Sequence, residues 1–222
     1  MLTQRGMERQ QKNEGLMALL LRLRALGIDD RPLLEAIEQT PRDRFVPVQC
    51  IDRPYFTRSF PMECGQSMTG VDQVVRTVHA MDLSSKHAVL EIGTGTGYQA
   101  ALIARLAKKI VTIDRFSRLT EKAKQRFEHL GIDNIIAQQA DGHDGVSDQR
   151  LFDRIVVNGT FVGFPRQFLD HLTSGGVMIT AIGEAPGEQM LVRLTKIGSR
   201  FDREDLFPVR MAALRTGVAE FL

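Results

Sequence analysis

From about residue 86 onward, short apolar runs alternate with longer stretches whose apolar residues recur at helical spacing. The short, branched runs predict buried strands, and the helical spacing predicts amphipathic helices between them. We expect strands near residues 87–92, 109–113, 134–139, 153–157, 176–182 and 189–195, and helices near 97–107, 117–130 and 164–172. This alternation predicts an α/β fold, with a mostly parallel sheet and helices on both faces.

The pattern before this region predicts helices and one long irregular loop. Leucines recur at helical spacing between Leu16 and Leu26, after polar residues 1–13 that we expect to be frayed. Asp30 is the expected cap of a second helix. The prolines and aromatic side chains of residues 45–70 indicate an ordered loop, and a helical pattern follows it.

We therefore expect one domain over residues 1–222. Its N-terminal helices and loop occupy residues 1–80, and the α/β core occupies residues 81–222.

Composition narrows the function classes. The chain has 222 residues, 43% of them hydrophobic and 25% charged, which is ordinary for a globular protein. A net charge of +2 gives no reason to expect nucleic acid or membrane as a partner. The apolar stretch 16–28 is too short to span a bilayer and contains Arg22 and Arg24. Two sparse cysteines fit a reducing cytoplasm, and five scattered histidines indicate no metal site.

The strongest local signal is the segment 89–100, VLEIGTGTGYQA. It predicts a buried strand, a glycine turn and a helix whose free N–H groups face a ligand in that turn. The spacing of Gly93, Gly95 and Gly97 is common in sites for S-adenosylmethionine. Gly95, Gly97 and Ala100 also satisfy the dinucleotide fingerprint, so the glycines alone leave both cofactors open.

Acidic residues at the ends of the next two strands favour the methyl donor. Asp114 ends the second strand and can accept hydrogen bonds from ribose hydroxyls in either cofactor. Asp141 ends the third, where a carboxylate can accept from the exocyclic amine of adenine, and Gly142 leaves room for the base. An acid at that third position is expected for methyltransferases rather than dehydrogenases.

The order of motifs resembles the protein-L-isoaspartate O-methyltransferase family from about Leu23 to Leu214. The matching segments are 41–47 (PRDRFVP), 65–69 (GQSMT), 91–100 (EIGTGTGYQA), 141–145 (DGHDG) and 207–210 (FPVR). The resemblance implies a Rossmann-like class I methyltransferase fold with an N-terminal helical extension. It also implies methylation of the carboxylate of L-isoaspartyl or D-aspartyl residues in damaged proteins, with S-adenosyl-L-methionine as cofactor and isoaspartyl peptides as partners.

The same resemblance suggests roles for individual residues. Thr69 falls where the family has a serine, and its hydroxyl is the expected catalytic group. The expected cofactor-binding residues are Glu91, Gly93, Gly95, Gly97, Asp114, Asp141 and Gly142. The expected substrate-binding residues are Gln66, Ser67, Asn158, Thr160 and Arg210.

Three departures from the family pattern leave alternatives open. Thr69 replaces a serine, Thr57 replaces an acid, and residues 158–160 (NGT) replace Thr-Ala-Ala. Thr69 also suits a plain helix N-cap. Asn158 and Phe161 resemble part of the Asn-Pro-Pro-Tyr motif of amino-group methyltransferases. A non-catalytic, cofactor-binding relic that serves a protein partner is the third possibility.

Overall fold

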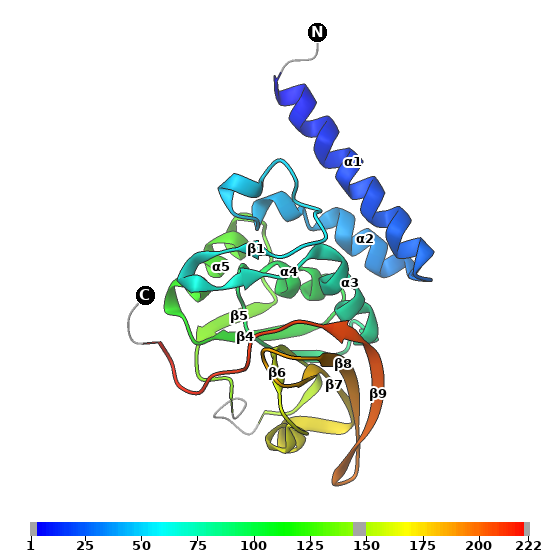
Figure 1. Ribbon diagram of the computed structural model, residues 1–222, viewed down its shortest axis with the longest axis vertical. Coiled ribbons are helices and arrows are strands. Elements are labelled where there is room, and N and C mark those ends of the chain that lie inside the picture. The colour runs from blue at the N-terminus through cyan, green and yellow to red at the C-terminus, as the bar shows by residue number, and fades with distance from the viewer. Residues whose placement is uncertain (1–3, 144–149, 220–222) are drawn as a thin grey trace.

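A seven-stranded sheet in the order β5-β4-β3-β6-β7-β8-β9 forms the centre of the computed structural model, which describes residues 4–143 and 150–219 (Figure 1). Its strands are β3 Ala88–Ile92, β4 Lys109–Asp114, β5 Ile135–Gln139, β6 Phe152–Phe161, β7 Leu172–Gly183, β8 Gln189–Ile197 and β9 Arg200–Val209. Neighbouring strands are parallel from β5 to β7, whereas β8 pairs antiparallel with both β7 and β9. The predicted mostly parallel sheet is confirmed.

Alternate side chains of the central strands enter two separate cores. Val89, Ile110 and Val156 pack into the cluster shared with the helices, whereas Leu90 and Val111 pack into the cluster on the opposite face. Because both faces are covered, these strands show unbroken apolar runs in the sequence rather than a polar–apolar alternation.

The helices lie mainly on one face of the sheet (Figure 1). They are α1 Gln4–Ala25, α2 Arg31–Gln39, α3 Val71–Ala80, α4 Tyr98–Ala104 and α5 Ser117–His129. The side chain of Asp30 accepts from Leu33 N at 3.3 Å, so the predicted cap of α2 is confirmed. Residues 4–13 are helical, so the prediction that they are frayed was wrong.

The opposite face is covered by a shorter element than the sequence predicts. Residues 164–172 were expected to form a helix, and the structure has the 3₁₀ helix η4 Arg166–His171 instead. Pro165 precedes it and β7 begins directly after it, so this segment is confined to a short helical stretch between the proline and the strand. Phe168 still fills the core there, with its ring 5.9 Å from that of Phe161.

Strand β9 is absent from the sequence-based prediction, which treats this stretch as a tail. Most of residues 200–206 are charged, and most of the side chains of this edge strand are exposed. An edge strand with one neighbour needs no apolar run, so hydrophobic periodicity does not reveal it. The loop 45–70 likewise contains short elements that the sequence does not indicate: η2 Val48–Cys50, β1 Phe60–Pro61, η3 Glu63–Gly65 and β2 Ser67–Met68. A further short element, η1 Arg42–Arg44, lies just before this loop.

Parallel pairing brings the predicted cofactor residues to one edge of the sheet. Ile92 pairs with Ile113 and Asp114 pairs with Gln139, so β3, β4 and β5 end together. The chain after β9 returns across this edge, as the red trace in Figure 1 shows. Its residue Gly217 donates to the carboxylate of Asp141 at 2.6 Å.

Candidate cofactor and acceptor site

The turn between β3 and α4 has the backbone conformation that its glycines predict. Gly93, Gly95 and Gly97 have φ values of 92°, 54° and 86°, all in the left-handed region. Gly93 N and Thr94 N donate to Ile113 O at 2.8 and 3.2 Å, which ties the turn to β4. The turn therefore has a fixed shape in the protein itself.

The surroundings of these glycines differ, and the difference separates packing from binding. A Cβ at Gly97 would lie 2.8 Å from the Phe127 ring, and one at Gly93 would lie 3.0 Å from Asn158 Cβ. A Cβ at Gly95 would meet nothing closer than the end of Met62 at 3.9 Å. Gly93 and Gly97 are thus required by packing, whereas Gly95 presents open backbone to a ligand.

Asp114 lies beside Gly95, as predicted for the acid at the end of the second strand. Its two carboxylate oxygens accept from Gly95 N at 2.9 Å and Phe116 N at 3.0 Å. Burial raises the pKa of Asp114, although these two N–H groups act in the opposite direction. Each oxygen keeps a second acceptor position for a hydroxyl group.

Asp141 lies at the end of the third strand, where it accepts from His143 N at 2.9 Å and from Gly217 N. Burial alone would raise its pKa, but the two N–H donors prevail and the pKa is lowered. A Cβ at Gly142 would lie 2.3 Å from Ile92 Cγ2, so close packing also requires this glycine. The matching residues Asp144 and Gly145 lie outside the described residues.

Glu91 lies beneath the glycine turn rather than at its surface. Its side chain is 0% exposed, and its oxygens accept from Thr112 Oγ1 at 2.6 Å, Gln99 Nε2 at 3.0 Å and Asn158 Nδ2 at 3.4 Å. Burial raises the pKa of Glu91 to about 8, against the effect of these donors. Glu91 supports the turn from within the fold, and a direct cofactor contact for it stays a prediction.

The loop 45–70 carries the predicted acceptor residues and is called the acceptor loop below. A cavity of about 480 Å³ lies where the glycine turn meets this loop. Gly95 and Thr96 line one side, and Pro61, Met62 and Glu63 line another. Glu63 forms ion pairs with Lys122 and Arg118 of α5, which hold the loop over the turn. The loop that carries the predicted acceptor residues therefore packs against the predicted cofactor turn through its residues 61–63.

Thr69 stands directly before the cap of α3 and is not the cap itself. The N-cap residue is Gly70, with φ −57° and ψ 147°. The N-cap interpretation of Thr69 is therefore wrong. Its hydroxyl forms no hydrogen bond to any residue that the structure describes, and its carbonyl accepts from Arg42 Nη2 at 2.6 Å.

Some of the predicted substrate residues are exposed, and others are bonded within the fold. Gln66 and Ser67 are exposed on the acceptor loop, and Arg210 is exposed just after β9, so all three stay predictions. Thr160 is buried and its hydroxyl donates to Gly183 O at 2.8 Å, so its side chain is bonded within the fold and a substrate contact for it stays a prediction. The amide group of Asn158 donates to Gly93 O at 2.9 Å and accepts from Gln99 Nε2 at 3.1 Å, so it supports the glycine turn.

Several supporting residues were missed because their chemistry is ordinary in isolation. Gln99 and Arg42 stand in the matching segments 91–100 and 41–47 but were assigned no role there, and Thr112 lies in no motif. Only their buried partners identify what these three residues do. Gly217 reaches Asp141 from a distant part of the chain. A polar residue at an inward-facing strand position, such as Thr112 within an apolar run, is the one signal that the sequence offers.

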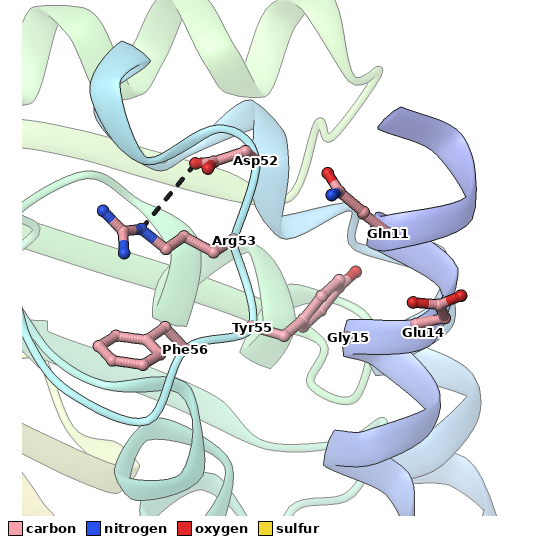
Figure 2. A pocket seen from close by; sticks show the side chains of 7 residues that line it. All are labelled: Gln11, Glu14, Gly15, Asp52, Arg53, Tyr55 and Phe56. Atoms are coloured by element: carbon pink, nitrogen blue, oxygen red, sulfur yellow. Dashed lines mark ion pairs between the residues drawn. The ribbon is translucent and has the colours of Figure 1, made fainter. Parts of the chain in front are cut away.

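A second hollow of about 390 Å³ lies away from the glycine turn, between α1 and the segment 52–56 (Figure 2). Figure 2 shows Tyr55 directed toward Gly15 of α1, with Glu14 and Gln11 along the same helix. A Cβ at Gly15 would lie 3.4 Å from Tyr55 Cδ2, so Gly15 lets α1 approach this loop. No glycine-turn residue lines this hollow, so we assign it no part in cofactor binding.

The sheet order, the glycine turn and the acids at the strand ends define the class of protein as a Rossmann-like methyltransferase. Solved structures agree on the fold. A Plasmodium falciparum chain named as a PCMT, solved with S-adenosyl-L-homocysteine, aligns with a TM-score of 0.75 at 20% identity, over 89% of this chain and 97% of that one. Another protein-L-isoaspartate O-methyltransferase aligns with a TM-score of 0.78 at 23% identity, over 91% of this chain and 67% of that one.

Sequence comparison identifies the family within this class. The model of the protein-L-isoaspartate(D-aspartate) O-methyltransferase family (PCMT) matches residues 12–218. A protein-L-isoaspartate O-methyltransferase of Rhizobium meliloti is 43% identical over 92% of this chain and 100% of its own length. One from Parvibaculum lavamentivorans is 38% identical over 91% of this chain and 92% of its own length. The chain belongs to the PCMT family, as its motifs predicted.

None of the helices in the described part of the chain has the length and apolar character needed to cross a membrane.

The open space at Gly95 generates a first prediction. Gly95→Val would place a branched side chain where the ligand approaches, and we expect affinity for S-adenosylhomocysteine to fall by about tenfold or more. Calorimetric titration measures this affinity. Gly131→Val is the matched control, because Gly131 has a similar φ of 61° and nothing within 4 Å of its Cβ position. Both variants should lose about 1–3 kcal/mol of stability through backbone strain, and equal loss of binding in both would contradict the assignment.

The buried carboxyl group of Glu91 generates a second prediction. Its pKa is about 8 in the folded protein, against an ordinary value of 4.5. Between these values the unfolded chain releases a proton that the folded protein retains, so this group makes stability fall as pH rises. The unfolding free energy of the wild type minus that of Glu91→Gln should therefore fall from about pH 5 to about pH 8, by at most a few kcal/mol, because one pKa unit corresponds to about 1.4 kcal/mol.

Denaturant unfolding across this pH range measures the difference. Glu63→Gln is the control, because its ion pair with Lys122 lowers the pKa of Glu63 and keeps it charged in both states above about pH 6. Its difference from the wild type should stay flat above about pH 6, where the difference for Glu91→Gln should still be falling. A difference for Glu91→Gln that is flat or rises with pH would contradict the raised pKa.

Proposed function

We propose that this protein transfers a methyl group from S-adenosyl-L-methionine to the side-chain carboxylate of isoaspartyl residues in proteins. One observation carries the proposal: a chain of this family has an open glycine turn and an acidic strand end, and the nearby loop carries the Thr69 hydroxyl, which has no hydrogen bond to any described residue. The named relatives support the substrate class. The substrates are then isoaspartyl-containing proteins, and the sparse, free cysteines support a cytoplasmic location.

The residues at the sheet edge fit the cofactor. The Gly95 backbone is open to a ligand, Asp114 keeps acceptor positions for ribose hydroxyls, and Asp141 can accept from the adenine amine. When bound, S-adenosyl-L-methionine supplies a methyl group on a positively charged sulfur. The remaining task of the protein is to hold and desolvate the acceptor.

A carboxylate acceptor explains why the site has no obvious general base. An aspartyl-type carboxylate is ionised at pH 7, so no proton has to be removed before it attacks. Alignment of the attacking oxygen with the methyl group and exclusion of water are the main contributions left to the protein. Thr69 fits this role, because its hydroxyl can donate to one carboxylate oxygen while the other attacks.

The structure gives no support to an amino-group acceptor. That alternative needs the Asn158 amide at the substrate, and this amide is bonded to Gly93, Glu91 and Gln99. Phe161 packs against Phe168 in the core of the opposite face. Both groups serve the fold.

Transfer of labelled methyl groups into an isoaspartyl peptide tests the proposal directly. The same peptide with a normal aspartyl residue and a peptide with a free amine serve as controls. We expect incorporation into the isoaspartyl peptide alone, and mild base should release the label as methanol, because the product is a methyl ester. Cofactor binding without incorporation would instead favour the non-catalytic relic.

Thr69 provides a second test, of the acceptor position. Thr69→Ala should lower turnover by about tenfold or more, because about 1.4 kcal/mol of lost alignment corresponds to a factor of ten. Thr69→Ser should retain activity, and affinity for S-adenosylhomocysteine should barely change in either variant. Initial rates and calorimetry measure these quantities.

Ser59→Ala is the control for Thr69→Ala, because it removes an exposed hydroxyl from the same loop. Its turnover should match that of the wild type. The role of Thr69 is refuted if Thr69→Ala keeps the parent rate, or if Thr69→Ser is as impaired as the alanine variant.

A further inference from the structure

Arg42 is an arginine of the N-terminal segment that is fully buried, at 0% exposure. Its Nε donates to Pro54 O at 2.8 Å, and its Nη2 donates to Thr69 O at 2.6 Å. The guanidinium carbon lies 4.4 Å from the centre of the Tyr98 ring. One side chain therefore contacts three segments that are distant in the sequence.

This burial is costly, which calls for an explanation beyond packing. Desolvation lowers the pKa of Arg42, and neither its bond to Pro54 O nor its bond to Thr69 O reaches a carboxylate. Its Nη1 and the Tyr98 hydroxyl are buried without hydrogen-bond partners in the described part of the chain. A buried charge with an unsatisfied donor destabilises a protein, and an apolar residue would usually pack there better.

The segments that Arg42 contacts belong to opposite sides of the site. Tyr98 begins α4 directly after Gly97 of the glycine turn. Thr69 carries the hydroxyl that we propose donates to the acceptor carboxylate. Pro54 belongs to the loop that packs on the residue after Thr69, where a Cβ at Gly70 would lie 1.8 Å from Thr57 O.

A second arginine holds the same loop from the other side. Arg22 of α1 donates to Tyr55 O at 3.4 Å and forms a two-bonded ion pair with Asp72, at 2.9 and 2.8 Å. Arg22 thus fixes the loop to α3, but it is partly exposed and none of its contacts reaches Tyr98. Of these two arginines, Arg42 alone connects the loop to the glycine turn.

We propose that Arg42 is a positioning residue that sets the acceptor loop, and with it Thr69, at a fixed place relative to the cofactor turn. It does so by holding the Pro54 and Thr69 carbonyls while its guanidinium plane rests on Tyr98. This inference rests on the proposed function and names a residue through which the two halves of that site are aligned.

Lysine cannot replace Arg42 in this role. A lysine ammonium carries the same charge, but it lacks the planar fork that donates in two directions and stacks on a ring. Arg42→Lys therefore keeps the buried charge and removes the geometry. This makes it a sharper variant than alanine, which would also leave a large cavity.

Kinetics of Arg42→Lys give the first readout. We expect kcat/KM for an isoaspartyl peptide to fall by about tenfold or more, mainly through KM for the peptide, because misplacement of an acceptor by a fraction of an ångström is enough for such a loss. Affinity for S-adenosylhomocysteine should change by less than about threefold. Arg42→Gln, which keeps an amide donor, is measured in the same way if the lysine variant does not fold.

Arg154→Lys is the matched control. Arg154 is also a buried arginine that donates to backbone carbonyls, those of Met81, Asp82 and Asp153. It pairs with Val89 near the start of β3, away from the glycine turn. This variant should lose thermal stability but keep the KM for the peptide. An equal rise in KM in both variants would overturn the proposal.

Amide hydrogen exchange gives a readout that does not depend on turnover. In Arg42→Lys, peptides covering residues 53–60 and 66–74 should exchange about tenfold faster than in the wild type, in the presence and absence of S-adenosylhomocysteine. In Arg154→Lys the same peptides should exchange as in the wild type. Unchanged exchange in Arg42→Lys would overturn the linkage. Faster exchange in Arg42→Lys, combined with a wild type that does not methylate the isoaspartyl peptide, would refute the proposed function and leave the linkage intact.

Discussion

The glycine turn depends on one buried carboxyl group beneath it. The Glu91 side chain of β3 lies inside the protein, where it accepts from side chains of β4, α4 and β6. The Thr112 hydroxyl also forms a 2.8 Å hydrogen bond with the Thr94 hydroxyl of the turn. The shape of the turn is therefore set by three neighbouring elements at once, and the open backbone at Gly95 follows from that support.

Within this one motif, some glycines are needed for packing, and another leaves space for a ligand. Gly93 and Gly97 have no room for a side chain, so they secure the path of the chain. Gly95 has room and leaves it to the ligand. Parallel pairing then brings Asp114 to the same edge of the sheet, where its carboxylate accepts from Gly95 N. A site of this kind can keep its donor half while the loops above it vary, because the sheet and not the loops fixes the geometry.

The sequence predicted the parts of the fold that depend on local pattern and parallel topology. Branched apolar runs marked β3, β4 and β6, and the motif order placed Asp114 and Asp141 at the ends of strands. Strand β9 was missed because an exposed edge strand carries no hydrophobic signal. Arg42 and Gln99 were missed because their roles arise only from contacts between segments far apart in the chain. The inward orientation of the Thr160 side chain could not be predicted, because a residue near the carboxyl end of a strand can turn its side chain into the core as readily as toward a ligand.

The departures from the family pattern acquire a different meaning once the contacts are known. Asn158 and Thr160 differ from the family at positions that were expected to meet the substrate, yet both side chains are bonded within the fold. Asn158 adds donors to Gly93 O and Glu91, so this change reinforces the turn that holds the cofactor. Only Thr57 and Thr69 remain on the acceptor side, and Thr69 keeps the hydroxyl. Because the contact between Gly70 and Thr57 uses the Thr57 backbone, the loop can hold Thr69 in place whichever side chain residue 57 carries. The differences from the family thus fall mainly on the support of the site, and the group expected to meet the carboxylate is retained.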